Sequence, residues 1–526
     1  MCVAEAFSPD DDSNENAVAE MGRDAGLPVC TSTELSGLYG LELRTVTAAL
    51  NASILPLAIA TASFVADGVA AAGIGAPVMV MRSDGGATDL AGFAAAPVRT
   101  LYSGPSASVA GALRYTGVTD AVVIEVGGTS TNIAAIRNGR PALSYVRVAS
   151  HATALRSVDV RVVGVAGGSM LRVRRGRVYG IGPRSAHIAG LRYASFTDPA
   201  QLAGATLEIG APLPGDPDDY AMLRLTSGDR VALTTTCAAN LLGLPDAADY
   251  CAASTDGART AFELVAAHMK LDATTIADHM LQAAGEEACE LALTVAASAR
   301  LEQPSIVGVG GGAGGLARRV AAMLGWPLVI PPHAEVISSI GDALSLLRAE
   351  RERTVANADA ATIEAMMDDV EAEVVAAGAS PASVEVRFEE VPERSTIRAV
   401  ATGAVGLQAG ALPGRRERED TEIRAGAPKG ATVEQHGRFW LIGDDKRVQV
   451  LDRYGDEVVE VEGVRTDGER VGEVFDALIK YRGPVTLRPT VWIVDGRRLV
   501  ELGSFDPATD PYAGRDDVAY LVGRAR

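Results

Sequence analysis

The chain has 526 residues, of which 48% are hydrophobic and 22% charged, a balance typical of a globular protein with more than one domain. Its formal net charge of −19 opposes binding to the phosphate backbone of nucleic acids, so no nucleic-acid partner is expected. The 5 cysteines form no CxxC pair and no metal-ligand pattern with the 6 scattered histidines, which indicates reduced thiols in a cytoplasmic protein.

The first 36 residues have the features of a domain end. We expect a short helix at 14–25 and a short strand at 27–30, and neither has a partner nearby in the sequence. The N-terminus has no basic region followed by an apolar run, so no signal peptide is expected. Residues 1–36 therefore either pack on distant elements or are the remnant of an upstream domain, in which case they are weakly supported and expose apolar surface.

An apolar stretch follows, and it raises the question of a membrane span. Residues 42–71 have a helical pattern, and Asp67 is the one charged residue between Ile54 and Met81. Pro56 and several glycines interrupt this stretch, and residues 78–81 have the composition of a strand. The sequence favours a buried helix followed by a buried strand, with no membrane partner.

Residues 122–139 combine two strands with a glycine-rich turn. Residues 122–126 predict a buried strand with the carboxylate of Glu125 near its end, and residues 132–136 predict a second strand. The Gly-Gly turn between them lets backbone N–H groups converge on an anion, and the hydroxyls that follow add donors. This is not a Walker A loop, which needs a lysine and a following helix. The alternative is an ordinary hairpin in which Glu125 caps a strand end.

A second glycine-rich turn follows the strand predicted at 305–309. Residues 310–315 lead directly into a helix predicted at 316–324. Such a strand-to-helix turn places the positive end of a helix dipole next to a ligand.

The character of the chain changes beyond residue 350. A charged helix is predicted at 357–377 and paired strands at 384–391 and 395–401, and the basic and acidic run within 412–430 is the best linker candidate. The strands after it are predicted at 439–442, 447–451, 458–461, 490–494 and 497–502, with Asp495-Gly496 as a hairpin turn. The expected domains are therefore 1–36, 37–350, an α+β extension at 351–411, a linker at 412–430 and a β-rich module at 431–526.

Six motifs occur in order: VMRSDGGATD, PVRTLYSGPSASVAGA, VIEVGGTSTN, DVRVVGVAGGSM, GIGPRSAH and VGVGGGAGGLARRVAAMLG. Together, from about Phe7 to about Ala401, they resemble the hydantoinase/oxoprolinase family, specifically its A-type, ATP-handling subunit. Members of this family cleave cyclic amides such as hydantoins and 5-oxoproline with ATP, and related members activate ketones for carboxylation. The resemblance implies an α/β fold of the actin-like (ASKHA) ATPase type, here incomplete at the N-terminus and followed by the strand-rich module.

The resemblance also implies a site that binds ATP and Mg²⁺. Its second phosphate loop would comprise Gly127, Gly128, Thr129, Ser130 and Thr131, and its adenosine-side loop Gly310, Gly311, Gly312, Ala313 and Gly314. Glu125 would hold a metal-bound water or orient the nucleophile. Asp159, with Gly167-Gly168-Ser169, matches a motif close to the active crevice, so Glu125 and Asp159 are the expected catalytic residues.

Several positions depart from the family pattern. Glu125 and Asn132 stand where the family has aspartate, and Cys237 stands where an acid is expected in its TVTDAN segment. The segment IAGLRYASF replaces the family's PGPACY. The family's first phosphate loop, DxGGTxTD, does not occur in this sequence, so half of the usual ATP site is not supplied by these residues.

Three functions remain open on the sequence. The first is a subunit of an ATP-dependent cyclic-amide hydrolase that phosphorylates the amide oxygen, with a B-type subunit or a second copy of the chain as partner. The second is a catalytically degenerate nucleotide-binding or scaffold relative. The third is a chaperone-like reactivating ATPase of the same superfamily.

Overall fold

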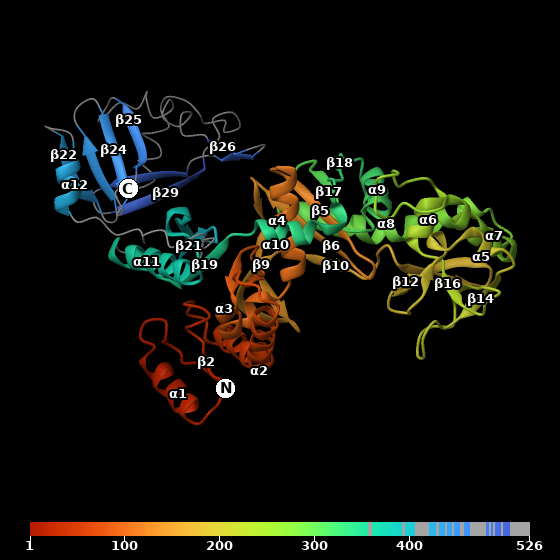
Figure 1. The fold of residues 1–526 in the computed structure, drawn as a ribbon, viewed down its shortest axis with the longest axis horizontal. Coiled ribbons are helices and arrows are strands. Elements are labelled where there is room, and N and C mark those ends of the chain that lie inside the picture. The colour runs from red at the N-terminus through yellow and green to blue at the C-terminus, as the bar shows by residue number, and fades with distance from the viewer. Residues whose placement is uncertain are drawn as a thin grey trace.

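The computed structural model describes residues 1–355, 360–391, 395–405, 420–427, 431–436, 439–443, 447–452, 457–462, 480–482, 485–487, 490–495 and 498–504. The described elements form an elongated arrangement with a central sheet, a lobe at one end and strands of the C-terminal region at the other (Figure 1). The N-terminal helices lie beside the central part of the molecule.

The central sheet holds both predicted glycine-rich turns. Its order is β10-β6-β5-β17-β18, with β7 also paired to β6. β5, β17 and β18 run parallel, whereas β6 is antiparallel to both β5 and β10. The predicted strands at 122–126, 132–136 and 305–309 are confirmed. The bounds are β5 (Ala121–Val126), β6 (Thr131–Arg137), β7 (Arg140–Pro141), β10 (Arg161–Val163), β17 (Ser305–Val309) and β18 (Leu328–Val329).

Helices cover both faces of this sheet because alternate side chains of its strands point to opposite sides. On one face Val123 packs in a cluster with residues of α4 (Ser103–Thr116) and α10 (Ile337–Leu344). On the other, Ile124 packs in a cluster with residues of α8 (Ala273–Ser298) and α9 (Ala313–Leu324). A Cβ on Gly111 or Gly341 would collide with backbone of the facing helix, so these glycines allow α4 and α10 to pack closely.

A lobe is inserted between β10 and α8, and Figure 1 shows it at the end of the molecule away from the C-terminal strands. Its sheet has the order β12-β11-β15-β16-β13, with β14 paired to β15, and its core surrounds the fully buried Phe262. The bounds are β11 (Ser169–Arg174), β12 (Arg177–Ser185), β13 (Arg192–Tyr193), β14 (Thr206–Gly210), β15 (Tyr220–Arg224), β16 (Arg230–Ala232), α5 (Pro199–Leu202), α6 (Thr235–Leu241) and α7 (Thr255–Met269).

A third sheet, in the order β20-β21-β19-β4-β3, joins early and late parts of the chain. Phe388 of β20 packs with Val370 of α11, a helix found where the charged helix was predicted. β19 spans the expected domain boundary at residue 350. The bounds are β3 (Met79–Met81), β4 (Ala87–Asp89), β19 (Leu347–Thr354), α11 (Ala360–Ala376), β20 (Glu385–Val391) and β21 (Thr396–Gly403).

The C-terminal region is rich in strands, as predicted. Within the expected linker the structure describes α12 (Asp420–Gly426), while 412–419 and 428–430 lie outside the described residues. β28 and β29 pair as the predicted hairpin, although Gly496 in its turn is outside the described residues. The strands are β22 (Thr432–His436), β23 (Phe439–Gly443), β24 (Arg447–Asp452), β25 (Glu457–Glu462), β26 (Lys480–Arg482), β27 (Val485–Leu487), β28 (Thr490–Asp495) and β29 (Arg498–Ser504).

The N-terminal segment has more support than the sequence suggested. Helix α1 (Ser13–Asp24) lies between β1 (Cys2–Val3) and β2 (Cys30–Thr31), which pair in parallel, so the expectation of a strand without a partner is wrong. The buried Glu15 carboxylate accepts hydrogen bonds from the Ser8 hydroxyl at 2.5 Å and from the Ser32 hydroxyl at 2.7 Å. Burial would raise the pKa of Glu15, but these hydrogen bonds lower it.

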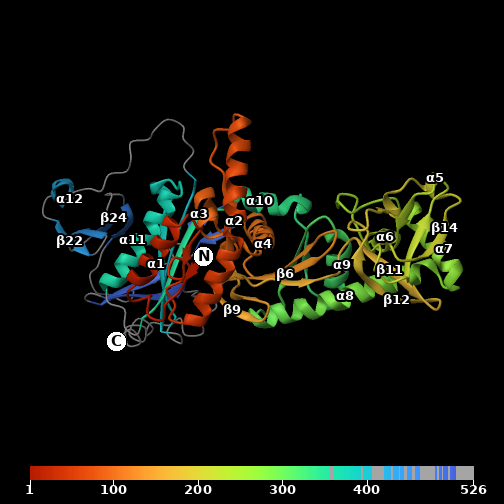
Figure 2. The same ribbon diagram turned by 90° about the horizontal axis from the view of Figure 1, so that it is seen from below.

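The expectation of a buried apolar helix is wrong in its second half. Helix α2 (Leu41–Ala71) is continuous through Pro56, and Leu57 and Phe64 are 72% and 78% exposed. Its end projects from the rest of the chain in Figure 2. Among the described residues it is the one helix long and apolar enough to cross a membrane, and 17% of its most apolar window is buried. Length and composition of a single helix are weak evidence for a span.

The first half of α2 is held by polar contacts. The amide Nδ2 of Asn51 donates to the Ala95 carbonyl at the end of α3 (Leu90–Ala95), 3.1 Å away. The Thr47 hydroxyl accepts from the backbone N–H of Ala154 in β9 (His151–Val158), which forms a hairpin with β8 (Leu143–Val148). The helix is therefore anchored at one end and exposed at the other.

Candidate functional site

The first glycine-rich turn lies against a second loop that contains Gly167 and Gly168. The N–H of Gly127 donates to the Ser130 carbonyl at 3.0 Å, which closes the β5–β6 turn. Gly167 and Gly168 then donate to the carbonyls of Gly127 and Gly128 at 3.0 and 3.1 Å. The two loops therefore run side by side, and a Cβ on Gly168 would collide with the Gly128 carbonyl.

The second glycine-rich turn meets the first at Val126. The N–H of Gly312 donates to the Val126 carbonyl at 2.9 Å. Gly310 has a φ of 84°, and a Cβ there would lie 2.6 Å from the same carbonyl oxygen. The structure thus brings together the two predicted loops, 127–131 and 310–314, although about 180 residues separate them in the sequence.

The tip of the first loop offers unused donors. Gly128 and Thr129 are exposed, and the structure gives their backbone N–H groups no acceptor among the residues it describes. A Cβ at Gly128 would meet nothing closer than the Tyr193 hydroxyl at 3.7 Å. Adjacent free amides with no side chain in the way can donate hydrogen bonds to a bound anion such as a phosphate group.

Glu125 lies on the side of β5 that faces α4. Its Oε1 accepts from the Ser108 hydroxyl of α4 at 2.5 Å, and its Oε2 accepts from the Asn132 amide at 2.8 Å. Asn132 is the direct cross-strand partner of Glu125. Two neutral donors therefore fix the orientation of this carboxylate.

Asp159, the other expected catalytic residue, follows β9. Its backbone N–H donates to the Ala142 carbonyl at 2.8 Å, and its carboxylate pairs with Arg161 at 3.3 Å. The structure gives no contact between Asp159 and Glu125, although the next residue, Val160, lines the same shallow hollow as Glu125 and Asn132.

No group of three or more His, Cys, Asp and Glu side chains that could hold a metal occurs in the part of the chain that the structure describes. Glu125 is therefore not part of a metal cage built only from side chains of the described residues. Mg²⁺ commonly binds through one or two carboxylates together with substrate phosphates, so Glu125 can serve only as one contact of such an ion.

Sequence reasoning missed the residues that support the loops from the inserted lobe. The N–H of Thr236, in α6, donates to the Gly167 carbonyl at 3.0 Å, and the Tyr193 hydroxyl lies beside Gly128 and Gly168. Burial raises the pKa of Tyr193 to about 12. Tyr250, 71% exposed, lies next to Gly311, where a Cβ would be 3.0 Å from its ring. No local pattern marks these residues, because their neighbours are distant in sequence.

The segment in which Cys237 replaces the family's acid is helix α6, the same helix whose Thr236 supports the Gly167 loop. Cys237 is fully buried in α6, and its thiol contacts the hydroxyls of Ser195 and Thr234, both at 3.3 Å. A thiol at this position packs in the core of the lobe rather than facing solvent.

Comparison with known proteins identifies solved structures with a similar fold. The chain is similar to an ATP-dependent caprolactamase from Pseudomonas jessenii, with 15% identity and a TM-score of 0.57 over 88% of this chain and 77% of that one. It is also similar to the nucleotide-free structure of an acetone carboxylase, with 17% identity and a TM-score of 0.52 over 86% of this chain and 69% of that one. No curated protein sequence matches it. The sequence model described as Hydantoinase/oxoprolinase matches residues 44–351, more than half of the chain, so this protein belongs to the hydantoinase/oxoprolinase family.

Proposed function

We propose that the chain is the ATP-handling, A-type subunit of an enzyme that opens cyclic amides. The observation that carries this proposal is the meeting of loops 127–131 and 310–314 at Val126, with the free amides of Gly128 and Thr129 at the exposed tip. Both loops would contact one nucleotide, the first at its phosphates and the second on its adenosine side.

The order of the central sheet supports an actin-like reading of the fold. The loop at 127–131 joins an antiparallel strand pair, β5 and β6, and the loop at 310–314 follows β17, which is parallel to β5. This is the arrangement expected of one half of an actin-like ATPase. The other half would provide the opposing phosphate loop, which this sequence lacks.

ATP would supply the phosphoryl group that turns the amide oxygen into a leaving group. The amides of Gly128 and Thr129 would hold its phosphates, and Glu125 would position a water bound to Mg²⁺. Asp159 would act at the edge of the same hollow, with Arg161 orienting its carboxylate. The cyclic amide would be hydrolysed with a B-type subunit or a second copy of the chain. The five free thiols, four of them buried, support a cytoplasmic location.

A second candidate function is a nucleotide-binding or scaffold subunit without chemistry. Two observations favour it: the neutral amide of Asn132 occupies the position of a family acid beside Glu125, and the buried thiol of Cys237 occupies another. Both changes remove negative charge that could act on a metal or a water.

Titration calorimetry with ATP and Mg²⁺ on the full chain tests the proposed site. We expect weak binding, with a dissociation constant above about 1 μM, because one phosphate clamp is lacking. Gly128→Val should abolish this binding without unfolding the chain, since a Cβ at Gly128 would meet its nearest neighbour, the Tyr193 hydroxyl, at an ordinary contact distance of 3.7 Å. Gly210→Val, at the end of β14 with no atom within 4 Å of its Cβ position, is the matched control.

Either of two results contradicts the proposal. Unchanged ATP affinity in Gly128→Val would remove the first loop from the nucleotide site. The second result concerns phosphate release from ATP, measured with a B-type subunit present and a hydantoin or lactam added. Release that depends on the added cyclic amide would support the enzyme, and its absence would favour the scaffold function.

A further inference from the structure

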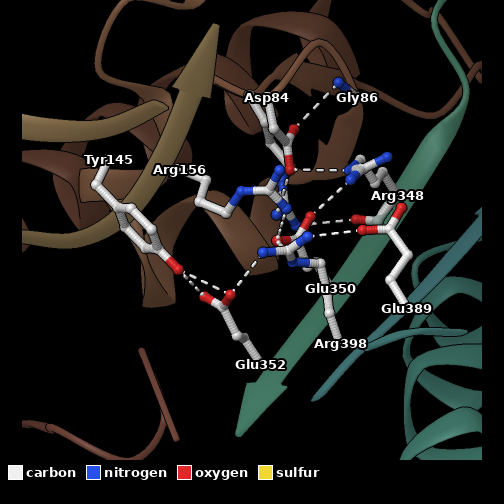
Figure 3. A network of polar contacts seen from close by, with 10 residues as sticks. Asp84, Gly86, Tyr145, Arg156, Arg348, Glu350, Glu352, Glu389 and Arg398 are labelled. Atoms are coloured by element: carbon white, nitrogen blue, oxygen red, sulfur yellow. Dashed lines mark hydrogen bonds and ion pairs between the residues drawn. The ribbon is translucent and has the colours of Figure 1, made fainter. Parts of the chain in front are cut away.

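A cluster of buried charged side chains lies away from the glycine-rich loops, where the third sheet meets the β8–β9 hairpin. Figure 3 shows that its side chains converge from several segments, among them Asp84 after β3, Arg156 of β9, Glu350 of β19 and Arg398 of β21. A cavity of about 50 Å³ opens at this cluster, and we call it the arginine cavity. Its charged lining consists of Arg82, Arg99, Arg156, Asp84, Glu350 and Glu352.

The carboxylate of Asp84 already has a full set of donors. It accepts from Arg82 at 2.9 Å, from Arg348 at 3.1 Å and from the backbone N–H of Gly86 at 3.1 Å. Burial alone would raise the pKa of Asp84, but the charges of Arg82 and Arg348 hold it down at about 2.

The two glutamates of the cavity are likewise paired. Glu350 accepts from Arg156 at 2.9 Å and from Arg348 at 2.6 Å. Glu352 accepts from Arg398 and from the Tyr145 hydroxyl, each at 2.7 Å. Each acidic side chain that lines the cavity is therefore already paired with an arginine, and Glu352 is also bonded to a tyrosine hydroxyl.

The hydrogen-bond donors without acceptors in this cavity belong to its arginines. Arg82 is 6% exposed, and its Nε has no hydrogen-bond acceptor among the described residues. Arg99 bonds through one nitrogen to the Glu34 carbonyl at 3.1 Å, and its one ion-pair partner among the described residues, Glu373, is 3.6 Å away. Burial lowers the pKa of Arg99 to about 10, and the nearby positive charge of Arg82 adds to this effect. A buried donor without an acceptor, beside a second weakly paired guanidinium, is a costly arrangement in the absence of an anion.

We propose that the arginine cavity binds a small oxyanion, a carboxylate or phosphate group, between Arg82 and Arg99. A guanidinium offers its donors in a planar fork that matches the oxygens of such groups, and the cavity has room for a group of this size. Leu35 and Ser36 of the N-terminal segment form part of its wall, so the bound anion also fastens that segment to the third sheet. None of the residues that line the cavity belongs to loops 127–131 or 310–314, and the inference does not depend on the proposed nucleotide site.

Thermal unfolding and titration calorimetry of the full chain with sodium acetate and with sodium phosphate test this inference. Sodium chloride at equal ionic strength serves as the reference. We expect at least one of the two oxyanions to raise the melting temperature beyond chloride, and the comparison of the two separates a carboxylate site from a phosphate site. Arg82→Gln and Arg99→Gln should each weaken binding about tenfold or more, because each removes charged hydrogen-bond donors.

Two controls locate the bound anion. Arg174→Gln, a comparable change at a half-exposed arginine of β11, should leave binding unchanged. Gly128→Val should also leave it unchanged, whereas an anion held by loop 127–131 would be lost in that variant. If Arg82→Gln fails to fold, Arg99→Gln and Arg99→Lys carry the test, because the Arg99 side chain is 18% exposed.

Three results would overturn the inference: no stabilisation by either oxyanion beyond chloride, binding that survives both Arg82→Gln and Arg99→Gln, or binding that is lost in Gly128→Val.

Discussion

Glu125 and Asn132 face each other across the β5–β6 hairpin, and the amide of Asn132 donates to the Glu125 carboxylate at 2.8 Å. The two residues occupy positions that are both expected to be aspartate in this family. The exchange of one acid for an amide therefore converts a pair of like charges, which a cation would have to bridge, into a hydrogen bond that is complete without one.

Asn132→Asp should create a pair of facing carboxylates that is stable only when a cation binds between them. Two carboxylates at this distance repel each other, so we expect a loss of about 0.5–1 kcal/mol of stability without metal, and recovery on addition of Mg²⁺. Thermal unfolding with and without Mg²⁺ measures both effects. Asn14→Asp is the matched control, because Asn14 also donates to a glutamate, Glu5, but at an exposed site. An equal response to Mg²⁺ in the two variants would mean that the pair at Glu125 has no special affinity for a cation.

The contact between the glycine-rich loops predicts that the same substitution lowers stability at Gly168 but hardly changes it at Gly128. Gly168→Ala should cost about 1–3 kcal/mol, because the new methyl group would collide with the Gly128 carbonyl and the Tyr193 hydroxyl. Gly128→Ala should change stability by less than about 0.5 kcal/mol, because its Cβ would make only ordinary van der Waals contacts, the nearest with the Tyr193 hydroxyl at 3.7 Å. Urea unfolding checks both values. Tyr193→Phe in the Gly168→Ala background should recover little, since the backbone collision remains.

The charge cluster predicts a loss of stability in acid. The folded-state pKa of Asp84, about 2, lies below its usual 3.8, so its stabilisation is complete above about pH 4 and is lost as the pH falls towards 2. The shift corresponds to about 2 kcal/mol. Unfolding measured between pH 5 and pH 2 should therefore show a steep decline in the wild type. Asp84→Asn should be less stable at neutral pH and should decline less steeply, and parallel curves for the two proteins would contradict the assignment.

The N-terminal segment should depend on Glu15. Arg44, fully buried in α2, donates to the Ser32 hydroxyl at 3.1 Å and to the Leu38 carbonyl at 2.5 Å, so Glu15 and Arg44 share one polar core. Glu15→Ala removes the negative charge that offsets the burial of Arg44 and leaves the Ser8 and Ser32 hydroxyls without their acceptor, at a cost of about 1–3 kcal/mol. Limited proteolysis should then cut the chain before Leu41 much faster than in the wild type. Glu20→Ala, on the exposed face of the same helix, should behave like the wild type.

The sequence by itself determined the parts of the site that rest on local pattern. The β-branched run ending at Glu125 and the Gly-Gly turn after it lie where the sequence predicts them, because strand and turn preferences act over a few residues. The strand-to-helix turn after β17 is also present but shorter than predicted, because α9 begins at Ala313 rather than at Leu316. The motifs also sufficed to identify the family.

The resemblance implied that the two glycine-rich loops share one site, but only the tertiary structure decided which residues touch. The bond from Gly312 to Val126, the support of Gly167 by Thr236 and the pairing of Asp84 with Arg348 join residues that lie tens to hundreds of positions apart. The exposure of Leu57 and Phe64 was misjudged for the same reason. An apolar helix becomes buried only when another element covers it, and the presence or absence of that cover is set by distant parts of the chain.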